Sequence, residues 1–227
     1  MVYSRYLDEG KEAVRPKIET GEFYHVYNRG VDKRNIFSDT RDMDRFLRSM
    51  RLFNSDKPIG SIYRASFLLS GPTAQLEVND KLVNVVAYCL NPNHYHLIVE
   101  QLIDGGVSEF MKRLGGGYAQ YFNEKNNRSG ALFQGKYRYK HIDSDSYLRH
   151  LSVYVNLNFK VHQLSCRTAK SSYEQYLKDT AGVNDYVVEN REIVLEHFET
   201  KRAYETYAKN TFVHIQQNKL DYKKIGL

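Results

Sequence analysis

The clearest hydrophobic pattern in the chain is a pair of apolar runs around the polar tripeptide Asn91-Pro92-Asn93. Asn tolerates left-handed backbone and Pro presets φ, so the pattern predicts a β-hairpin with its turn at this tripeptide. Side chains alternate between the faces of a strand. His94 and His96 therefore share one face, while Leu97 and Val99 point to the opposite face and are expected to pack against helices.

Two further segments alternate polar residues with apolar or aromatic ones, and each predicts a strand. The first spans residues 21–30 and the second spans residues 131–142. The second segment places Lys136, Arg138 and Lys140 on one face, with aromatic side chains on the other. This pattern suits a phosphate backbone with stacked bases, but an edge strand protected by lysines would show it too.

Helical periodicity appears on both sides of the hairpin. Asp39 or Thr40 can cap a helix that runs to about Phe53, and Asp143 or Ser144 can cap one that runs to about residue 158. In the second helix, Tyr154 and Asn158 are four residues apart and lie one turn above each other.

Three consecutive glycines at positions 115–117 interrupt a helical pattern over residues 107–123. Each glycine inside a helix costs roughly 1 kcal/mol relative to alanine. We therefore expect a hinge here, or a position where another backbone such as that of DNA comes very close.

The length of 227 residues allows one sizeable domain with a helical appendage. We expect a polar N-terminal arm at residues 1–20, a main domain at 21–160 and a C-terminal helical region at 161–227. The pattern weakens over residues 54–81, which we interpret as an insertion.

Composition adds a preference for a polyanionic partner. The formal net charge is +6, and the chain has 19 Tyr and 11 Phe, so nucleic acid is the natural candidate, although charge alone fits any basic protein. Only two cysteines occur, and Cys89 lies in a predicted buried strand, so we expect no disulfide framework. No signal-peptide core and no run of about 18 apolar residues is visible, so we expect a cytoplasmic protein without a membrane partner.

The paired histidines could share one metal ion, because side chains two positions apart on a strand have Cα atoms about 6.5–7 Å apart. If the helix bearing Tyr154 packs beside them, the Asn158 amide oxygen could add a third ligand. Such a mixed set suits Mn²⁺, Zn²⁺ or Mg²⁺. The ion would polarise a phosphoryl group for attack by Tyr154, whose free phenol has a pKa of about 10 and needs activation.

Tyr118 is the rival nucleophile, since it lies in the glycine-flanked stretch. Phe122 follows it by four residues and cannot bind metal, whereas Tyr154 is followed at the same spacing by Asn158. We therefore favour Tyr154.

Several segments together resemble the REP-associated tyrosine transposases, which are single-tyrosine HUH transposases. They occur in the family's order between about Phe23 and Asn158. The segments are Tyr24–Gly30, His94-Tyr95-His96 after the hairpin, Gly117–Asn123, Leu132–Tyr137 and Tyr154–Asn158.

The resemblance implies an α+β, ferredoxin-like or RRM-like fold with an antiparallel sheet and helices on one face. It places His94, His96 and Asn158 on the ligands of a Mg²⁺ or Mn²⁺ ion and Tyr154 on the nucleophile. It also implies cleavage of single-stranded DNA near hairpins, with a 5′-phosphotyrosine intermediate and a free 3′-hydroxyl. Phe159 replaces the proline that usually follows the family's asparagine, so the helix can end differently here.

Basic, amide and aromatic side chains near the predicted strand ends and in the glycine-flanked helix are candidate DNA contacts. They are Asn28, Arg29, Lys33, Arg34, Lys112, Arg113, Tyr118, Lys136, Arg138 and Lys140. Relatives that mobilise insertion sequences are dimers, so a homodimer is an open alternative for this chain.

Two functions of other classes compete with this interpretation. One is a domesticated protein that binds single-stranded nucleic acid without cleaving it. The other is a metal-dependent small-molecule enzyme of the cupin type, in which Glu100 joins the histidines. The predicted helices argue against the β-rich fold that a cupin needs.

Overall fold

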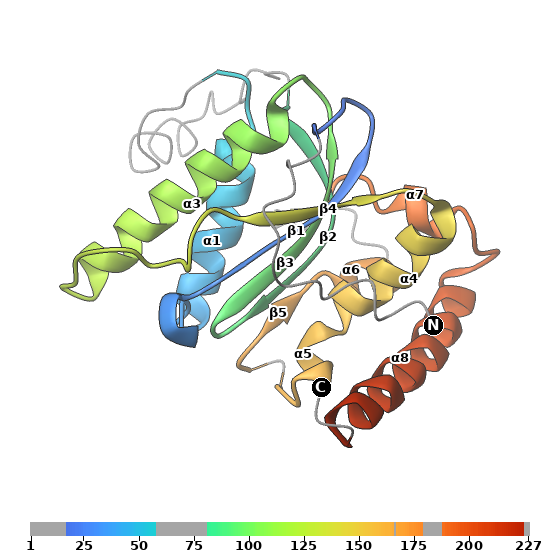
Figure 1. Cartoon of the computed structure of the whole chain (residues 1–227). Coiled ribbons are helices and arrows are strands. Elements are labelled where there is room, and N and C mark those ends of the chain that lie inside the picture. Colours follow the sequence, from blue (N-terminus) through green and yellow to red (C-terminus); the bar gives the residue numbers. More distant parts are fainter. Residues whose placement is uncertain (1–16, 58–80, 166, 179–187, 225–227) are drawn as a thin grey trace.

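The centre of the fold is a five-stranded antiparallel sheet with the strand order β4-β1-β3-β2-β5 (Figure 1). The structure is a computed structural model that describes residues 17–57, 81–165, 167–178 and 188–224, with side chains to residue 217. The strands are β1 Phe23–Arg29, β2 Val83–Asn91, β3 His94–Gln101, β4 Arg138–Ile142 and β5 Lys170–Ser171.

Helices cover both faces of the sheet (Figure 1). Helices α1 and α3 lie on one face, and α4 and α5 lie on the other with the C-terminal helices beyond them. The predicted α+β class is confirmed, but the helices are not restricted to one face, because the central strands bury side chains on both sides. The helices are α1 Thr40–Phe53, α3 Gly106–Lys125, α4 Asp145–Asn156, α5 Asn158–Val161, α6 Tyr173–Leu177, α7 Glu192–Leu195 and α8 Lys201–Lys224, with a 3-10 turn at Val31–Lys33.

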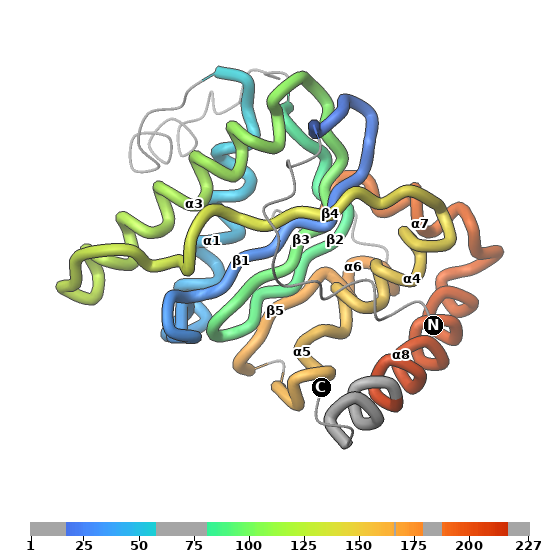
Figure 2. The backbone as a smooth tube through the Cα atoms, in the orientation of Figure 1, coloured from blue at the N-terminus to red at the C-terminus, as the bar shows by residue number. Residues whose placement is uncertain are grey.

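The predicted hairpin is present as β2 and β3, joined by a two-residue turn (Figure 2). Leu97 and Val99 are fully buried, as the alternation predicted. Their neighbour on the same face, Tyr95, meets the ring of Phe46 from α1, with centroids 5.1 Å apart. The two histidine side chains therefore lie on the opposite face, toward α4.

Helix α3 runs without a break through its three glycines, so the predicted hinge is wrong. A Cβ placed on Gly117 would lie 2.7 Å from Cε2 of Phe53 in α1, whereas Gly115 and Gly116 have nothing within 4 Å. The close approach expected at this triplet therefore exists, but the neighbour is a packed ring rather than DNA.

Both predicted helix caps are present. The Asp39 side chain accepts from the Asp42 N–H at 3.0 Å, and the Ser144 hydroxyl accepts from the Tyr147 N–H at 3.3 Å. The helix that Ser144 caps ends earlier than predicted, because the backbone leaves helical geometry at Leu157. Tyr154 therefore lies in α4, and Asn158 begins the short helix α5.

Most of the predicted insertion, residues 58–80, lies outside the described residues. The segments on either side of it meet at Asn54. Its Nδ2 donates to the Val83 carbonyl at 2.7 Å, and its Oδ1 accepts from the N–H groups of Leu82 and Val83 at 3.1 and 3.0 Å. The polypeptide thus leaves and rejoins the domain at one buried side chain.

The C-terminal region is part of the same core rather than a separate helical unit. Strand β5 extends the sheet beside β2, and Tyr204 of α8 is fully buried against α4. The Tyr204 hydroxyl accepts from Asn156 Nδ2 at 3.0 Å. None of the helices in the described part of the chain has the length and apolar composition that a membrane crossing requires.

Candidate active site on the histidine strand

The fold brings the four predicted active-site residues together from β3, α4 and α5. Asn158 Oδ1 lies 3.2 Å from His94 Nε2, and the Tyr154 ring centroid lies 5.7 Å from that of His96. His96 and Asn158 are buried, while His94 and Tyr154 are partly exposed. The arrangement places the Tyr154 phenol beside two imidazoles and an amide.

The proton on His94 is placed by Asn93, the last residue of the turn. Asn93 Nδ2 donates to the Lys33 carbonyl at 3.2 Å, which turns Asn93 Oδ1 toward His94 Nδ1 at 2.6 Å. An amide oxygen only accepts, so His94 carries its proton on Nδ1 and keeps a lone pair on Nε2. Two acceptors, His94 Nε2 and Asn158 Oδ1, consequently face each other.

Asn91 lies between these two acceptors. Its Nδ2 donates to Asn158 Oδ1 at 2.7 Å and lies 2.9 Å from His94 Nε2. The residue is fully buried. The sequence pattern marked Asn91 only as part of a turn, and its place as the last residue of β2, opposite His94, is the signal that could have identified it.

His25 of β1 is a second residue that the sequence analysis missed. Its Nε2 lies 2.9 Å from His96 Nδ1, and both rings are buried. Burial, reinforced by the charge of Lys140, lowers the pKa of His25 to about 3, and burial also lowers the pKa of His96 well below its usual value. Both imidazoles stay neutral near pH 7, which is the form that binds metals.

Two effects shift the pKa of the Tyr154 phenol in opposite directions. Burial raises its pKa, and a side-chain hydrogen bond from Asn158 lowers it by favouring the phenolate. Asn158 Nδ2 is buried and has no hydrogen-bond partner of good geometry among the described residues, so this interaction is a loose one. On balance the pKa of Tyr154 is raised, and the phenol needs further activation to act as a nucleophile.

The donor set fits a divalent cation. Across the described residues, no three His, Cys, Asp or Glu side chains gather closely enough to hold a metal ion, so a site here depends on the Asn158 oxygen. His94 Nε2 and Asn158 Oδ1 lie 3.2 Å apart with the Asn91 Nδ2 group against both, and His96 lies beside them with its ring centroid 5.2 Å from that of His94. Imidazole nitrogen and amide oxygen are suitable ligands for Mn²⁺ or Mg²⁺.

A third unpredicted residue near this site is His162, which follows α5. Its ring lies roughly edge-on to that of His94, with centroids 4.8 Å apart and planes at 70°. The side chain is exposed. It occurs four residues after Asn158, a helical spacing that could have suggested its position.

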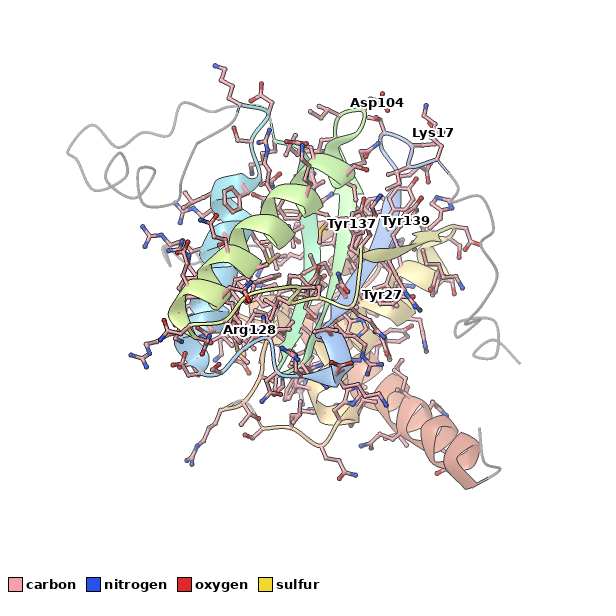
Figure 3. All side chains as sticks on the ribbon, turned by 60° about the vertical axis from the view of Figure 1, so that its left-hand side comes forward. Lys17, Tyr27, Asp104, Arg128, Tyr137 and Tyr139 are labelled. Carbon is pink, nitrogen blue, oxygen red and sulfur yellow. The ribbon has the colours of Figure 1, made fainter. Side chains whose placement is uncertain are left out.

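Basic side chains from the neighbouring strands lie on the histidine face. Residues directly opposite each other in an antiparallel pair share a face. Arg29 pairs with His94, and Tyr27 pairs with both His96 and Arg138. By the same registers, His25 and its partner Lys140 lie on this face. Arg29, Arg138 and Lys140 thus flank the site. Tyr27, which is labelled in Figure 3, lies on the same face, with its ring centroid 5.8 Å from that of His96.

Tyr118 is corrected from a candidate DNA contact to a core residue. It is fully buried among aromatic rings of α1 and α3, and its hydroxyl donates to the Ile36 carbonyl at 2.6 Å. Burial raises the pKa of Tyr118 far above its usual value. Neither DNA nor a phosphodiester can reach this phenol.

The other candidate DNA contacts divide by face. Lys112 and Arg113 belong to α3, on the face opposite the histidines, and Arg113 donates to Glu109 and to the Ser55 carbonyl. Asn28 donates to the Gly135 carbonyl at 3.0 Å and so secures the loop before β4. Lys33, Arg34 and Lys136 are exposed near the ends of β1 and β4.

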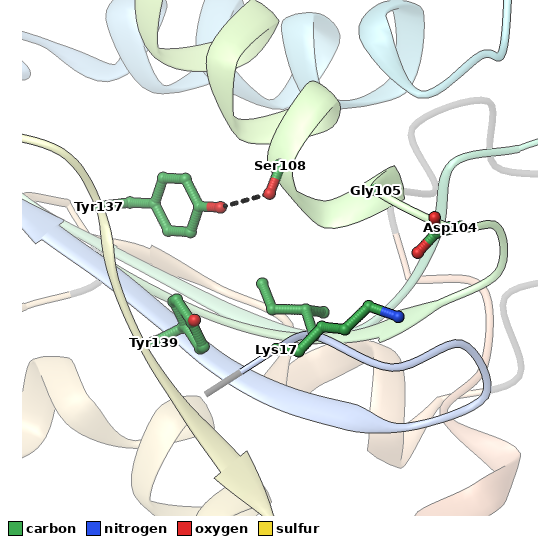
Figure 4. A pocket seen from close by; sticks show the side chains of 7 residues that line it. Lys17, Asp104, Gly105, Ser108, Tyr137 and Tyr139 are labelled. Atoms are coloured by element: carbon green, nitrogen blue, oxygen red, sulfur yellow. Dashed lines mark hydrogen bonds between the residues drawn. The ribbon is translucent and has the colours of Figure 1, made fainter. Parts of the chain in front are cut away.

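An open pocket of about 350 Å³ lies away from the histidines, on the α3 side of β4 (Figure 4). Tyr137 closes one wall, and its hydroxyl lies 3.2 Å from that of Ser108. The lining residues are Lys17, Ile18, Asp104, Gly105, Ser108, Tyr137 and Tyr139. The pocket contains none of the predicted catalytic residues.

Part of the chain is similar to a known family. Residues 75–158 match the family described as "Transposase IS200 like". No curated protein matches the chain. A solved structure described as "Structure of the REP associates tyrosine transposase bound to a REP hairpin" aligns with a TM-score of 0.44 and 14% identity, covering 80% of this chain and 98% of that chain. Over residues 75–158, which hold all four predicted active-site residues, the chain is thus similar to the IS200-like transposases, and the transposase resemblance seen in the sequence is confirmed.

Proposed function

We propose that this chain is a metal-dependent transposase or endonuclease that cleaves and rejoins single-stranded DNA near hairpins. The supporting observation is the meeting of His94 Nε2 and Asn158 Oδ1 at 3.2 Å, with the Tyr154 phenol beside the neighbouring histidine. Two acceptors next to a nucleophile are groups that cation-assisted phosphoryl transfer can use, once the ion takes the place of the Asn91 amide beside them.

His94, His96 and Asn158 would hold a Mg²⁺ or Mn²⁺ ion. When bound, the ion would polarise the phosphoryl group and favour the phenolate over the phenol. Asn158 would act twice, through Oδ1 toward the ion and through Nδ2 toward Tyr154.

Tyr154 would attack the phosphorus atom of the scissile phosphodiester after losing its proton to solvent. A bond forms between Tyr154 Oη and phosphorus, the bond from phosphorus to the 3′ oxygen breaks, and that oxygen gains a proton from solvent. The DNA on the 3′ side keeps its 5′ phosphate on the tyrosine. A second 3′-hydroxyl can reverse the reaction and join a different strand, since one phosphodiester replaces another.

The DNA strand would approach across β4 and β1. Arg29, Arg138 and Lys140 can bind consecutive phosphates there, and Tyr27 offers a ring for a base. Single-stranded DNA carrying a hairpin is the proposed partner.

The test incubates purified protein and Mn²⁺ with hairpin-bearing single strands from the flanks of its own gene, labelled at the 3′ end. We expect labelled protein on a denaturing gel. The adduct should disappear with a chelator and in Tyr154→Phe, and persist in Tyr118→Phe, whose hydroxyl is buried. Binding without an adduct under either Mn²⁺ or Mg²⁺, and unchanged in a His94→Ala, His96→Ala double variant, would instead indicate a protein that binds nucleic acid without cleaving it.

A further inference from the structure

We propose that His25 is a positioning residue, which accepts a hydrogen bond from His96 and thereby holds that ligand in its metal-binding tautomer. This inference rests on the proposed metal-dependent function. It concerns a residue on a different strand, 71 positions away from His96 in sequence.

The two rings meet edge to edge. His25 Nε2 and His96 Nδ1 are 2.9 Å apart, the ring centroids are 5.1 Å apart and the ring planes differ by only 19°. Rings stacked face to face would not bring two nitrogens this close at that centroid separation. The contact is therefore a nearly coplanar N–H···N hydrogen bond between buried groups.

Only one of the two nitrogens can carry the shared proton. A neutral imidazole has one protonated nitrogen and one lone pair. If His96 is to offer a lone pair to a cation through Nε2, its proton must be on Nδ1, and His25 Nε2 must then accept. Metal-bound histidines commonly have their other ring nitrogen held in this way.

His94 shows the same solution with a different partner. Its Nδ1 faces the Asn93 oxygen at 2.6 Å, and the Asn93 amide is oriented by the Lys33 carbonyl. The two candidate ligands of β3 are thus each held through Nδ1, one by the turn and one by the neighbouring strand. By this comparison, His25 orients His96 in addition to packing in the core.

Two substitutions distinguish the two possible roles of His25, which are to accept a hydrogen bond from His96 or only to pack in the core. His25→Gln places an amide oxygen near the position of Nε2, so it can still accept from His96. His25→Phe keeps a planar ring of similar size but has no acceptor. Mn²⁺ binding measured by electron paramagnetic resonance should weaken about 10–100-fold in His25→Phe and stay within about threefold of wild type in His25→Gln.

The tautomer can be read without any metal. Long-range ¹H–¹⁵N correlation spectra of metal-free protein with ¹⁵N-labelled histidine should show His96 protonated on Nδ1 in wild type and His25→Gln. In His25→Phe a substantial Nε2-protonated population should appear. A wild-type His96 protonated on Nε2 would overturn the inference, as would an unchanged tautomer in His25→Phe.

Failure of the proposed metal-dependent function and failure of the proposed role of His25 would give different results. If wild type binds no Mn²⁺, the metal-dependent function fails, and the metal-free spectra still decide whether His25 sets the tautomer. If wild type binds Mn²⁺, His96→Ala loses binding and folded His25→Phe binds as wild type does, the role of His25 is refuted while the metal site stands.

Discussion

Asn91 lies between two candidate metal ligands, although by sequence it is only the first residue of a turn. Its two N–H bonds are donated to groups that would otherwise face each other as acceptors. The amide therefore satisfies both acceptors while no cation is bound. Its contribution to the free energy of unfolding should change from stabilising to destabilising when an oxygen replaces its N–H₂ group.

Asn91→Asp tests this role of the amide. Without metal, the variant should lose about 1–3 kcal/mol of unfolding free energy, because a donor between two acceptors becomes a third acceptor. Mn²⁺ should restore stability, since a carboxylate attracts the cation. Thermal unfolding with and without Mn²⁺ should give a larger rise in Tm for Asn91→Asp than for wild type.

Asn91→Leu is the control, because it removes the donor without adding a charge. It should be destabilised like Asn91→Asp but show no larger Mn²⁺ response than wild type. Equal Mn²⁺ shifts in all three proteins would mean that Asn91 lies too far from the cation to matter.

Among the elements, α3 depends on glycine at one position of its triplet. Gly117 faces Phe53 of α1, whereas Gly116 faces open space. The two helices can pack this closely only because no Cβ stands between them.

Gly117→Ala should therefore lower the unfolding free energy by about 1–3 kcal/mol through overpacking against Phe53. Gly116→Ala should raise it by about 0.5–1 kcal/mol, since alanine is the better helix former where there is space. Urea unfolding of the two variants measures both effects. Equal changes for the two would show that α3 does not pack on α1 as described.

Strand β4 carries one of the basic side chains proposed to bind DNA. Arg138 lies on the histidine face, and Lys112 lies on α3 against the other face. Arg138→Ala should weaken binding of single-stranded DNA and reduce the slope of log K against log salt by about 0.7, the value for one lost phosphate contact.

Lys112→Ala removes the same charge on the opposite face and should leave both quantities unchanged. Fluorescence anisotropy over a range of salt concentrations provides the comparison. Equal losses of DNA affinity in the two variants would mean that DNA binds elsewhere on the protein, or that the affinity depends only on the net charge.

Across the whole molecule, the C-terminal region supports the helix that carries the proposed nucleophile. Asn156, two residues after Tyr154, donates to the Tyr204 hydroxyl and accepts from Ser172 Oγ at 2.5 Å. The helix α4 is thus held between the sheet and α8 by a buried polar network.

Tyr204→Phe should cost about 1–3 kcal/mol of unfolding free energy, because Asn156 Nδ2 is left buried without its acceptor. Tyr207→Phe, on the same helix but partly exposed, should change stability by less than about 0.5 kcal/mol. Chemical unfolding followed by circular dichroism compares them. A Tyr204→Phe protein as stable as wild type would show that α8 does not brace α4.

The sequence alone predicted the features that depend on near neighbours in the chain. The hairpin, its register and both helix caps follow from turn chemistry and apolar periodicity, which act over a few residues. The same local patterns were misleading where packing decided the outcome. The glycine triplet lies within one continuous helix, where Gly117 packs against Phe53, and the predicted second helix ends before Asn158.

Only the tertiary structure decided which residues complete the site. His25 meets His96 across 71 residues, and Asn91 meets Asn158 across 67. Such partners are not encoded by any spacing along the chain, because strand pairing and helix packing must first bring them together. The sequence therefore determined which side chains could carry the chemistry, and the fold determined how their lone pairs and protons are arranged.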